Sequence, residues 1–270
     1  MADWSRVFID AAVALYCLGV AVSVTMLVTK RRDRLYLIPA VTVAGFVVHF
    51  IGIVLRGWHE GALPLQNMRG ILFLLAWAAI SVYLIAHFRF RVELLGTVIL
   101  SLVVILMVVT LLIPSDPEGA QSDAESYGSI RTAGIAIHVL PGIIGVSALF
   151  LTFAASLVYL AQDRALKAHR PLRFFVRLPS LEQCERLAHQ SLTWGFALLT
   201  FSVVTGVVSA IFRPDGKWHW VLREKWSILA WLILAVVIYD RIFTGGWRGR
   251  KAAYLSILGF AVIILRMVGM

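Results

Sequence analysis

Residues Gly206–Tyr254 read GVVSAIFRPDGKWHWVLREKWSILAWLILAVVIYDRIFTGGWRGRKAAY. Two apolar runs enclose a basic, tryptophan-rich segment, and a glycine-rich basic turn follows the second run. Similar apolar runs recur along the chain, and several reach the roughly 20 residues needed to cross a ~30 Å hydrocarbon core. They are continuous and not alternating, which excludes a membrane β-barrel. The stretch therefore predicts an all-α, polytopic membrane protein whose basic segment lies at one membrane surface.

Composition supports this class. The chain has 270 residues, of which 60% are hydrophobic and 15% charged, and its mean hydropathy is +0.85. The formal net charge is +10, which in a soluble protein would suggest nucleic-acid binding. In a membrane chain such an excess of Lys and Arg marks topology, so no nucleic-acid partner is expected.

The apolar runs predict about eight transmembrane helices. The links between them are too short for a soluble domain, so residues 1–270 are expected to form a single integral membrane domain. The eight expected spans are Phe8–Val28, Tyr36–Leu55, Ile71–Ala86, Leu94–Ile113, Ala133–Ala161, Ser191–Phe212, Trp226–Ile242 and Ala252–Val268. The sixth helix is expected to begin before its span, because Ser180 and Gln183 fit a capping box.

The distribution of Lys and Arg predicts the orientation. The odd-numbered links carry 16 of the 25 Lys and Arg residues and the other side carries 9. Positive loops stay in the cytoplasm, so both termini are expected on the outer side of a multi-pass cell (inner) membrane protein. The acidic link Pro114–Arg131 then lies outside, as a solvated and mobile loop.

Two histidines, His49 and His138, fall inside the predicted spans, where ionisable groups are functional candidates. At ~1.5 Å per residue both imidazoles are expected roughly 8–9 Å deep in the outer leaflet. Two neutral imidazoles at matching depth on separate helices suit the axial ligation of haem iron. Alternatively, each histidine only hydrogen-bonds a neighbouring helix. Pro141 is expected to disturb its helix, either making room for a macrocycle or serving helix packing alone.

Outward positive charges gather beside aromatic residues. Trp218 and Trp220 are flat enough to cover a porphyrin face, and nearby cations suit its propionates. Snorkelling cations and an ordinary aromatic belt are the alternatives. The cations in question are Arg56, Arg213, Lys217, Arg223 and Lys225.

Four blocks, in order, resemble the CcsA/HemX group of cytochrome c assembly proteins, which handle haem at the outer face of the membrane. The first joins His49 to Leu55-Arg56 and, past Gly61, to Ala76-Trp77. The second is His138-Val139, which opens a long helix. The third runs from Leu178-Pro179-Ser180 to Gly195-Phe196 and Thr205-Gly206. The fourth is the opening stretch with its Gly246–Lys251 turn.

The chain departs from the haem-synthase branch of this group. That branch has a motif W-x-W-D-P-K-E-x-W, and this chain matches it at Trp218, Trp220, Glu224 and Trp226. Substitutions fall at Val221, Leu222 and Arg223. Tyr239 stands where the branch has a histidine, and another family histidine falls beyond Met270. The resemblance therefore points nearer to the HemX-like or YpjD-like branch than to a full haem synthase.

The resemblance implies haem handling in cytochrome c maturation, with haem b at the outer face in a system II-like manner. His49 and His138 would ligate the iron, while Trp218, Trp220 and the five cations would enclose it. No catalytic residue is assigned; the chain would be at most a haem-lyase component. The partners expected are membrane proteins of cytochrome c maturation or a respiratory complex. The alternative is a non-catalytic scaffold or regulatory subunit that docks through Ser180–Gln190 or the outer loops.

Overall fold

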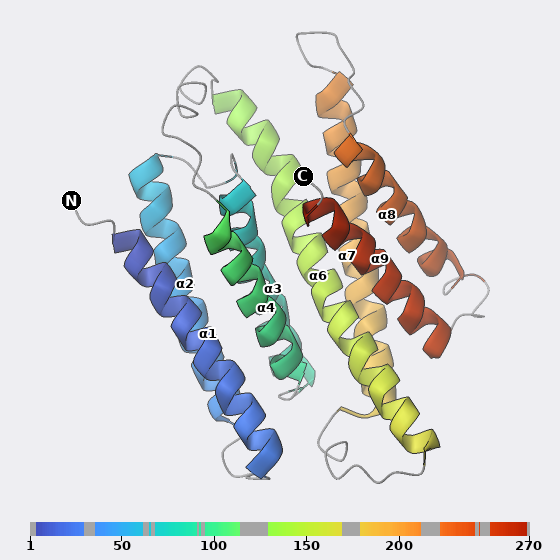
Figure 1. Cartoon of the computed structure of the whole chain (residues 1–270). Coiled ribbons are helices and arrows are strands. Elements are labelled where there is room, and N and C mark those ends of the chain that lie inside the picture. The colour runs from blue at the N-terminus through green and yellow to red at the C-terminus, as the bar shows by residue number, and fades with distance from the viewer. Residues whose placement is uncertain are drawn as a thin grey trace. The chain divides into compact units, whose positions relative to one another are not determined.

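The computed structural model describes the helices of the protein and a few residues of the links (Figure 1). Within the described residues there are eight α-helices and no strand, which confirms the predicted all-α class. The described residues are 4–29, 36–61, 65, 68–90, 92, 95–113, 129–168, 179–211, 222–240, 243 and 249–268.

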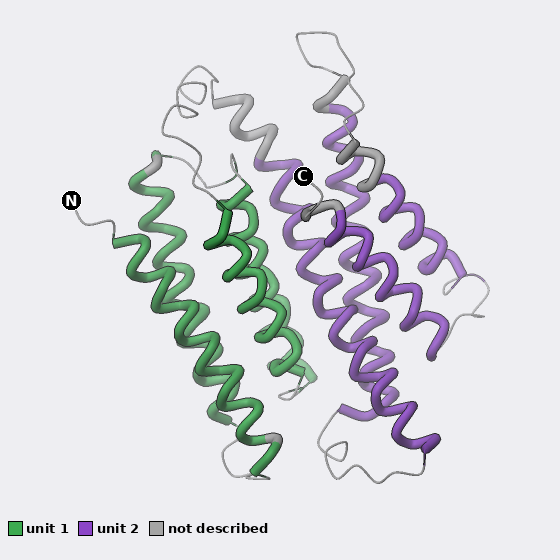
Figure 2. The backbone as a smooth tube through the Cα atoms, viewed as in Figure 1, with its two compact units in different colours: residues 1–128 green, residues 129–270 purple. Residues whose placement is uncertain are grey.

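The chain divides into two compact units, residues 1–128 and 129–270 (Figure 2). Each unit is treated by itself below. A single membrane domain over residues 1–270 therefore stays a prediction.

Unit 1 is a four-helix bundle. Each helix packs against the next along the chain, and the first also packs against the last, which closes the ring. Glycines of the second helix admit side chains of the first: a Cβ at Gly45 would lie 2.7 Å from a ring carbon of Tyr16, and one at Gly52 3.1 Å from Ile9. The helices are α1 (Trp4–Thr29), α2 (Leu37–Glu60), α3 (Met68–Phe90) and α4 (Leu95–Leu112).

Unit 2 repeats this arrangement with the same ring of neighbours. Its first two helices approach most closely at a pair of glycines, where a Cβ on Gly145 or Gly195 would lie 3.0 Å from the carbonyl oxygen of the other. Small residues allow such close backbone contact between membrane helices. The helices are α6 (Ser129–Lys167), α7 (Leu181–Ile211), α8 (Leu222–Tyr239) and α9 (Arg250–Val268).

The eight expected spans correspond one to one to these eight helices. Six helices contain described segments long and apolar enough to cross a membrane, and they belong to α1, α2, α3, α4, α6 and α7. The apolar described part of α8 is shorter, Ile228–Tyr239. The protein is a multi-pass membrane protein.

The third helix differs from its predicted length. The expected span was Ile71–Ala86, whereas α3 extends over 23 residues, from Met68 to Phe90. Arg69 at the start and Arg89 in the last turn ended the apolar window in the sequence, but charged side chains at helix ends do not stop the backbone. A larger share of α3 is buried than of any other helix of unit 1.

The predicted capping box at the start of α7 is confirmed. The Gln183 amide donates to Ser180 Oγ over 3.1 Å, and the Ser180 amide donates to Gln183 Oε1 over 3.0 Å. Two amides at the helix start are thereby satisfied reciprocally. The helix begins at Leu181, ten residues before the span expected from Ser191.

Removing the cap should destabilise unit 2 modestly. We expect Ser180→Ala to lower the free energy of unfolding by about 1 kcal/mol, because the Gln183 amide loses its side-chain acceptor. Thermal unfolding in mild detergent measures this. Trp194→Leu, at an exposed position of α7, is the control. An unchanged midpoint for Ser180→Ala would contradict the role given to the cap.

The turn that closes the opening stretch is described only at its end. Gly249 has φ +63°, a backbone conformation that favours glycine, and its amide donates to Glu185 Oε1 over 3.2 Å. The next residue, Arg250, forms an ion pair with Asp163 of α6. These contacts fix the start of α9 against α6 and α7, so this part of the turn serves the packing of unit 2.

Candidate functional site

His138 lies in the seam between α6 and α7 of unit 2. Its Nδ1 is 2.7 Å from the carbonyl oxygen of Ser202. A carbonyl oxygen only accepts, so Nδ1 carries the proton and the neutral ring keeps its lone pair on Nε2. Nε2 has no hydrogen-bond partner among the described residues. The contact with α7 therefore selects the tautomer in which Nε2 can ligate a metal.

The His138 ring rests against Gly206, one turn after Ser202 on the same face of α7. A Cβ on Gly206 would lie 2.6 Å from Cε1 and 3.0 Å from Nδ1 of the imidazole. Real Cβ atoms do not approach so closely, so glycine is what allows the ring to lie here. Ser202 completes the arrangement, because its hydroxyl donates to the His138 carbonyl oxygen over 2.9 Å.

The helix that carries His138 continues through Pro141. Helix α6 is unbroken from Ser129 to Lys167, with the proline inside it. Proline removes the hydrogen bond that its own nitrogen would make four residues back, but it does not end the helix. Beside it, a Cβ on Gly142 would lie 2.7 Å from Ser202 Oγ, so α7 lies close to α6 at this level.

His49 is buried in the interior of unit 1, with none of its surface exposed. Its Nδ1 is 3.3 Å from the hydroxyl of Tyr16 on α1. Its Nε2 is buried and has no hydrogen-bond partner among the described residues. The Tyr16 ring lies on Gly45, one turn before His49, and this packing holds the phenol in place.

Both histidines therefore share one pattern within their own units. A residue of a neighbouring helix contacts Nδ1, and Nε2 has no hydrogen-bond partner among the described residues. A glycine provides space for an aromatic ring, which is that of Tyr16 beside His49 and the imidazole itself at His138. Hydrogen bonding to a neighbouring helix, the alternative considered from sequence, is thus met at Nδ1 without using Nε2. Along their own helices, α2 continues to Glu60 and α6 begins at Ser129, which places each histidine about two and a half to three turns from that helix end.

Two arginine side chains lie near His49, on the other side of a shared contact with Phe73. The ring of Phe73 on α3 meets the His49 ring edge-on, with 6.4 Å between centroids and 84° between planes. Over the same phenyl ring stand the guanidinium carbons of Arg56 at 5.8 Å and Arg69 at 5.9 Å. The histidine, one aromatic ring and two guanidinium groups thus form one contiguous cluster in unit 1.

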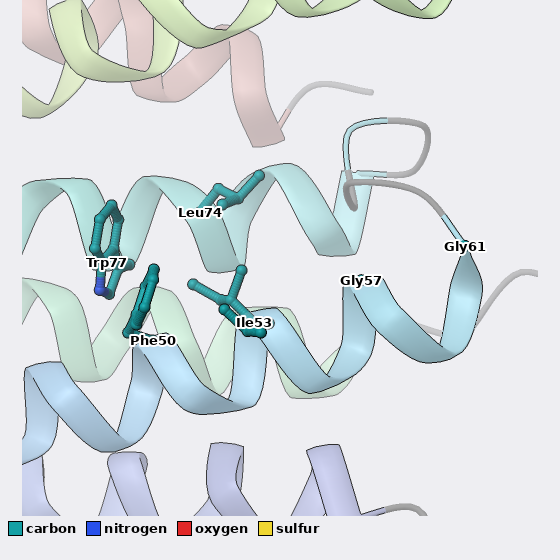
Figure 3. Close-up of a pocket in the computed structure, with 7 residues that line it drawn as sticks. Phe50, Ile53, Gly57, Gly61, Leu74 and Trp77 are labelled. Atoms are coloured by element: carbon teal, nitrogen blue, oxygen red, sulfur yellow. The ribbon is translucent and has the colours of Figure 1, made fainter. Parts of the chain in front are cut away.

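An apolar pocket of about 490 Å³ lies between α2 and α3 (Figure 3). Phe50, Ile53 and Gly57 line it from α2, and Leu74 and Trp77 line it from α3. The Phe50 and Trp77 rings stack with centroids 5.5 Å apart. Phe50 and Gly57 lie roughly 80–100° round α2 from His49, but Ile53 lies one turn after it, so the pocket borders the helix face that carries the polar cluster.

Comparison with known proteins bears on the whole chain. A family model described as Cytochrome C assembly protein matches residues 65–270. The chain belongs to the cytochrome c assembly protein family.

Curated relatives agree with this membership. A "Cytochrome c biogenesis protein CcsA" of Prochlorococcus marinus (strain NATL2A) is 29% identical over 248 residues, which cover 80% of this chain and 76% of the relative. The protein of the same name in Guillardia theta is 24% identical, over 89% of this chain and 84% of the relative. That of Prochlorococcus marinus (strain MIT 9303) is 25% identical, over 96% and 88%. The resemblance to CcsA-type cytochrome c assembly proteins is confirmed, and the HemX-like branch stays a prediction.

The predicted site residues of this cytochrome c assembly protein are only partly described. Trp218, Trp220, Arg213 and Lys217 lie outside the described residues, as does most of the acidic loop Pro114–Arg131. Arg223 and Lys225 belong to the first turn of α8, but their side chains are not described. Tyr239, at the family's histidine position, ends α8 with 60% of its surface exposed. His49 and His138 belong to different units, so their joint ligation of one iron stays a prediction.

Four residues that matter here were not singled out from sequence as site residues: Tyr16, Ser202, Gly206 and Arg69. Tyr16 is a polar tip in an apolar run, and Gly206 interrupts a series of β-branched residues. Each acquires its role through a partner on another helix.

Proposed function

We propose that this membrane protein handles haem for cytochrome c maturation and presents it at the outer face of the membrane, in a system II-like manner. Its family membership and the names of its relatives point to cytochrome c biogenesis. The observation that carries the haem assignment is the state of the two histidines. Each has Nδ1 engaged by a neighbouring helix and Nε2 without a partner among the described residues.

The residues present fit haem b. Haem supplies an iron that accepts two axial imidazole nitrogens. His49 and His138 would provide them, each oriented by its Nδ1 contact, as metal-ligating histidines commonly are. Trp218 and Trp220 would cover the macrocycle, while Arg56, Arg213, Lys217, Arg223 and Lys225 would neutralise the propionates. An inner (cytoplasmic) membrane location and an outer position of both termini belong to the same proposal.

Covalent attachment of haem to a cytochrome would need another membrane protein of the maturation machinery. The substitutions at Val221, Leu222 and Arg223 and the tyrosine at 239 argue against a complete synthase. A scaffold subunit docking through Ser180–Gln190 is less well supported, since Cys184, Leu187 and Ala188 of this segment are buried within unit 2.

An absorption spectrum tests the proposal directly. Protein purified in mild detergent, or reconstituted with haem, should show a Soret band and the visible bands of low-spin bis-imidazole haem. Absence of any Soret band after reconstitution would refute the haem assignment and favour the scaffold.

The hydroxyl of Tyr16 provides a finer test. For His49 Nε2 to ligate iron, Nδ1 must carry the proton and donate it to the Tyr16 oxygen. Tyr16→Phe removes only this acceptor, since the ring can stay on Gly45. We expect haem to be retained and its midpoint potential to rise, because an imidazole without the Nδ1–H acceptor donates less electron density to iron.

Spectroelectrochemical titration measures that shift. Tyr83→Phe, which alters a fully buried tyrosine of α3 in the same unit, is the matched control. The apoprotein should lose about 1 kcal/mol of stability from the missing hydrogen bond. A potential that stays the same or falls in Tyr16→Phe would contradict the role of Tyr16 beside His49.

A further inference from the structure

Arg56 and Arg69 converge on one buried aromatic ring in unit 1. Phe73 is 2% exposed, and both guanidinium carbons lie within 6 Å of its centroid. Cations over an aromatic face gain from the ring quadrupole. The phenyl ring therefore has two planar, fork-shaped donors within 6 Å of its centroid, one from α2 and one from the adjacent helix α3.

The charge around Arg69 is mostly of its own sign. Arg56 and Arg6 repel it electrostatically, and Asp10 attracts it. Its Nε atom is buried and has no hydrogen-bond partner among the described residues. Like charges gathered near low-dielectric surroundings cost free energy, and an anion that binds between them removes part of that cost.

The two guanidinium groups and the His49 ring all contact Phe73, and Arg56 lies on the same face of α2 as His49. Arg56 follows His49 by seven residues on α2, which is two turns on one helix face and about 10 Å along the axis. Phe73 bridges the two levels, because its ring meets His49 edge-on and carries the guanidiniums above it. A flat ligand held at His49 Nε2 and standing along α2 would reach the guanidiniums with its far edge.

We propose that Arg56 and Arg69 form a paired carboxylate clamp for the propionates of haem bound at His49. The inference deepens the proposed function and rests on it. Haem carries its two carboxylates on one edge, and guanidinium binds a carboxylate through two parallel hydrogen bonds. Arg56 was already a candidate from sequence; Arg69 and the part played by Phe73 come from the structure. The clamp determines which edge of the haem faces the outer end of unit 1.

Comparing haem with its dimethyl ester tests the clamp. The ester keeps the iron and the ring but has no carboxylates. In titrations of the full-length apoprotein in mild detergent, Arg56→Gln and Arg69→Gln should each weaken haem binding about tenfold, the loss expected of one charge-assisted contact. Affinity for the dimethyl ester should stay the same. Arg69→Lys should be intermediate, because it keeps the charge and loses the planar fork.

Arg89→Gln is the matched control, an exposed arginine in the last turn of α3. Unchanged ester binding also reports that a variant is folded. Equal losses for haem and ester, as expected if the arginines hold a lipid phosphate or only stabilise the bundle, would overturn the clamp. So would unchanged haem binding in the double variant. Failure of the wild-type protein to bind either compound would refute the proposed function itself.

Discussion

Replacing both axial candidates, as His49→Ala with His138→Ala, is expected to abolish the low-spin haem spectrum. Each single replacement should leave iron with one protein imidazole and shift the spectrum toward a high-spin, five-coordinate form. The reason lies in the unshared Nε2 atoms, which are the groups that each ring offers to a metal. The measurement is visible absorption of haem-reconstituted protein in mild detergent.

Added imidazole separates lost ligation from lost folding. If unit 1 remains folded, free imidazole should enter the space left by His49→Ala and restore the low-spin bands. His59→Ala, at an exposed position near the end of α2, is the control and should resemble the wild type. A low-spin spectrum that persists in the double variant would show that other residues ligate the iron.

Adding one methyl group at Gly206 is expected to disturb haem binding nearly as much as removing His138. In Gly206→Ala the new Cβ would have to share space with the imidazole, 2.6 Å from Cε1. The ring must swing away, which breaks the Nδ1 contact with Ser202 and moves Nε2. Haem affinity should fall at least about tenfold, the equivalent of roughly 1.4 kcal/mol.

Folding stability should change little in the same variant. Overpacking costs about 1–3 kcal/mol, whereas replacing glycine by alanine inside a helix returns about 1 kcal/mol. The predicted signature is therefore poor haem binding in a protein with near-normal thermal unfolding. Val207→Ala, the neighbouring position on α7, is the control. Normal haem binding in Gly206→Ala would remove His138 from the site.

The fold was predictable because each membrane helix is encoded by a continuous apolar run in its own local sequence. The length and continuity of the apolar runs located eight helices, and the Ser180–Gln183 pair located the start of α7. The errors fell at helix ends, as in α3, where a helix continues past its apolar window. The organisation into two four-helix units was not predicted, since it depends on which helices pack together.

The site was predictable only as a set of residue types. Intramembrane histidines are rare enough to be noticed singly, so the sequence alone singles out His49 and His138 as candidates. Their partners were not, because the rotation of each helix decides whether Tyr16 or Gly206 faces a histidine. Arg69 and Phe73 lie one turn apart on α3, so their pairing follows from sequence spacing. The approach of Arg56 from α2 to the same ring does not, because it depends on how the two helices pack. The tryptophan-rich segment, with Trp218 and Trp220, keeps its proposed role of covering the haem macrocycle.

The two Nδ1 contacts differ in how they withstand mutation. Tyr16 engages His49 through a side chain, and a single codon change can remove it. Ser202 engages His138 through its backbone carbonyl, which every residue possesses, so no substitution at 202 deletes the acceptor itself. Random mutagenesis should therefore recover other small residues at position 202, which is buried against Gly142, and very few replacements at position 206. The position of the His138 ring is therefore most sensitive to mutation at Gly206, where any side chain would occupy the space of the ring.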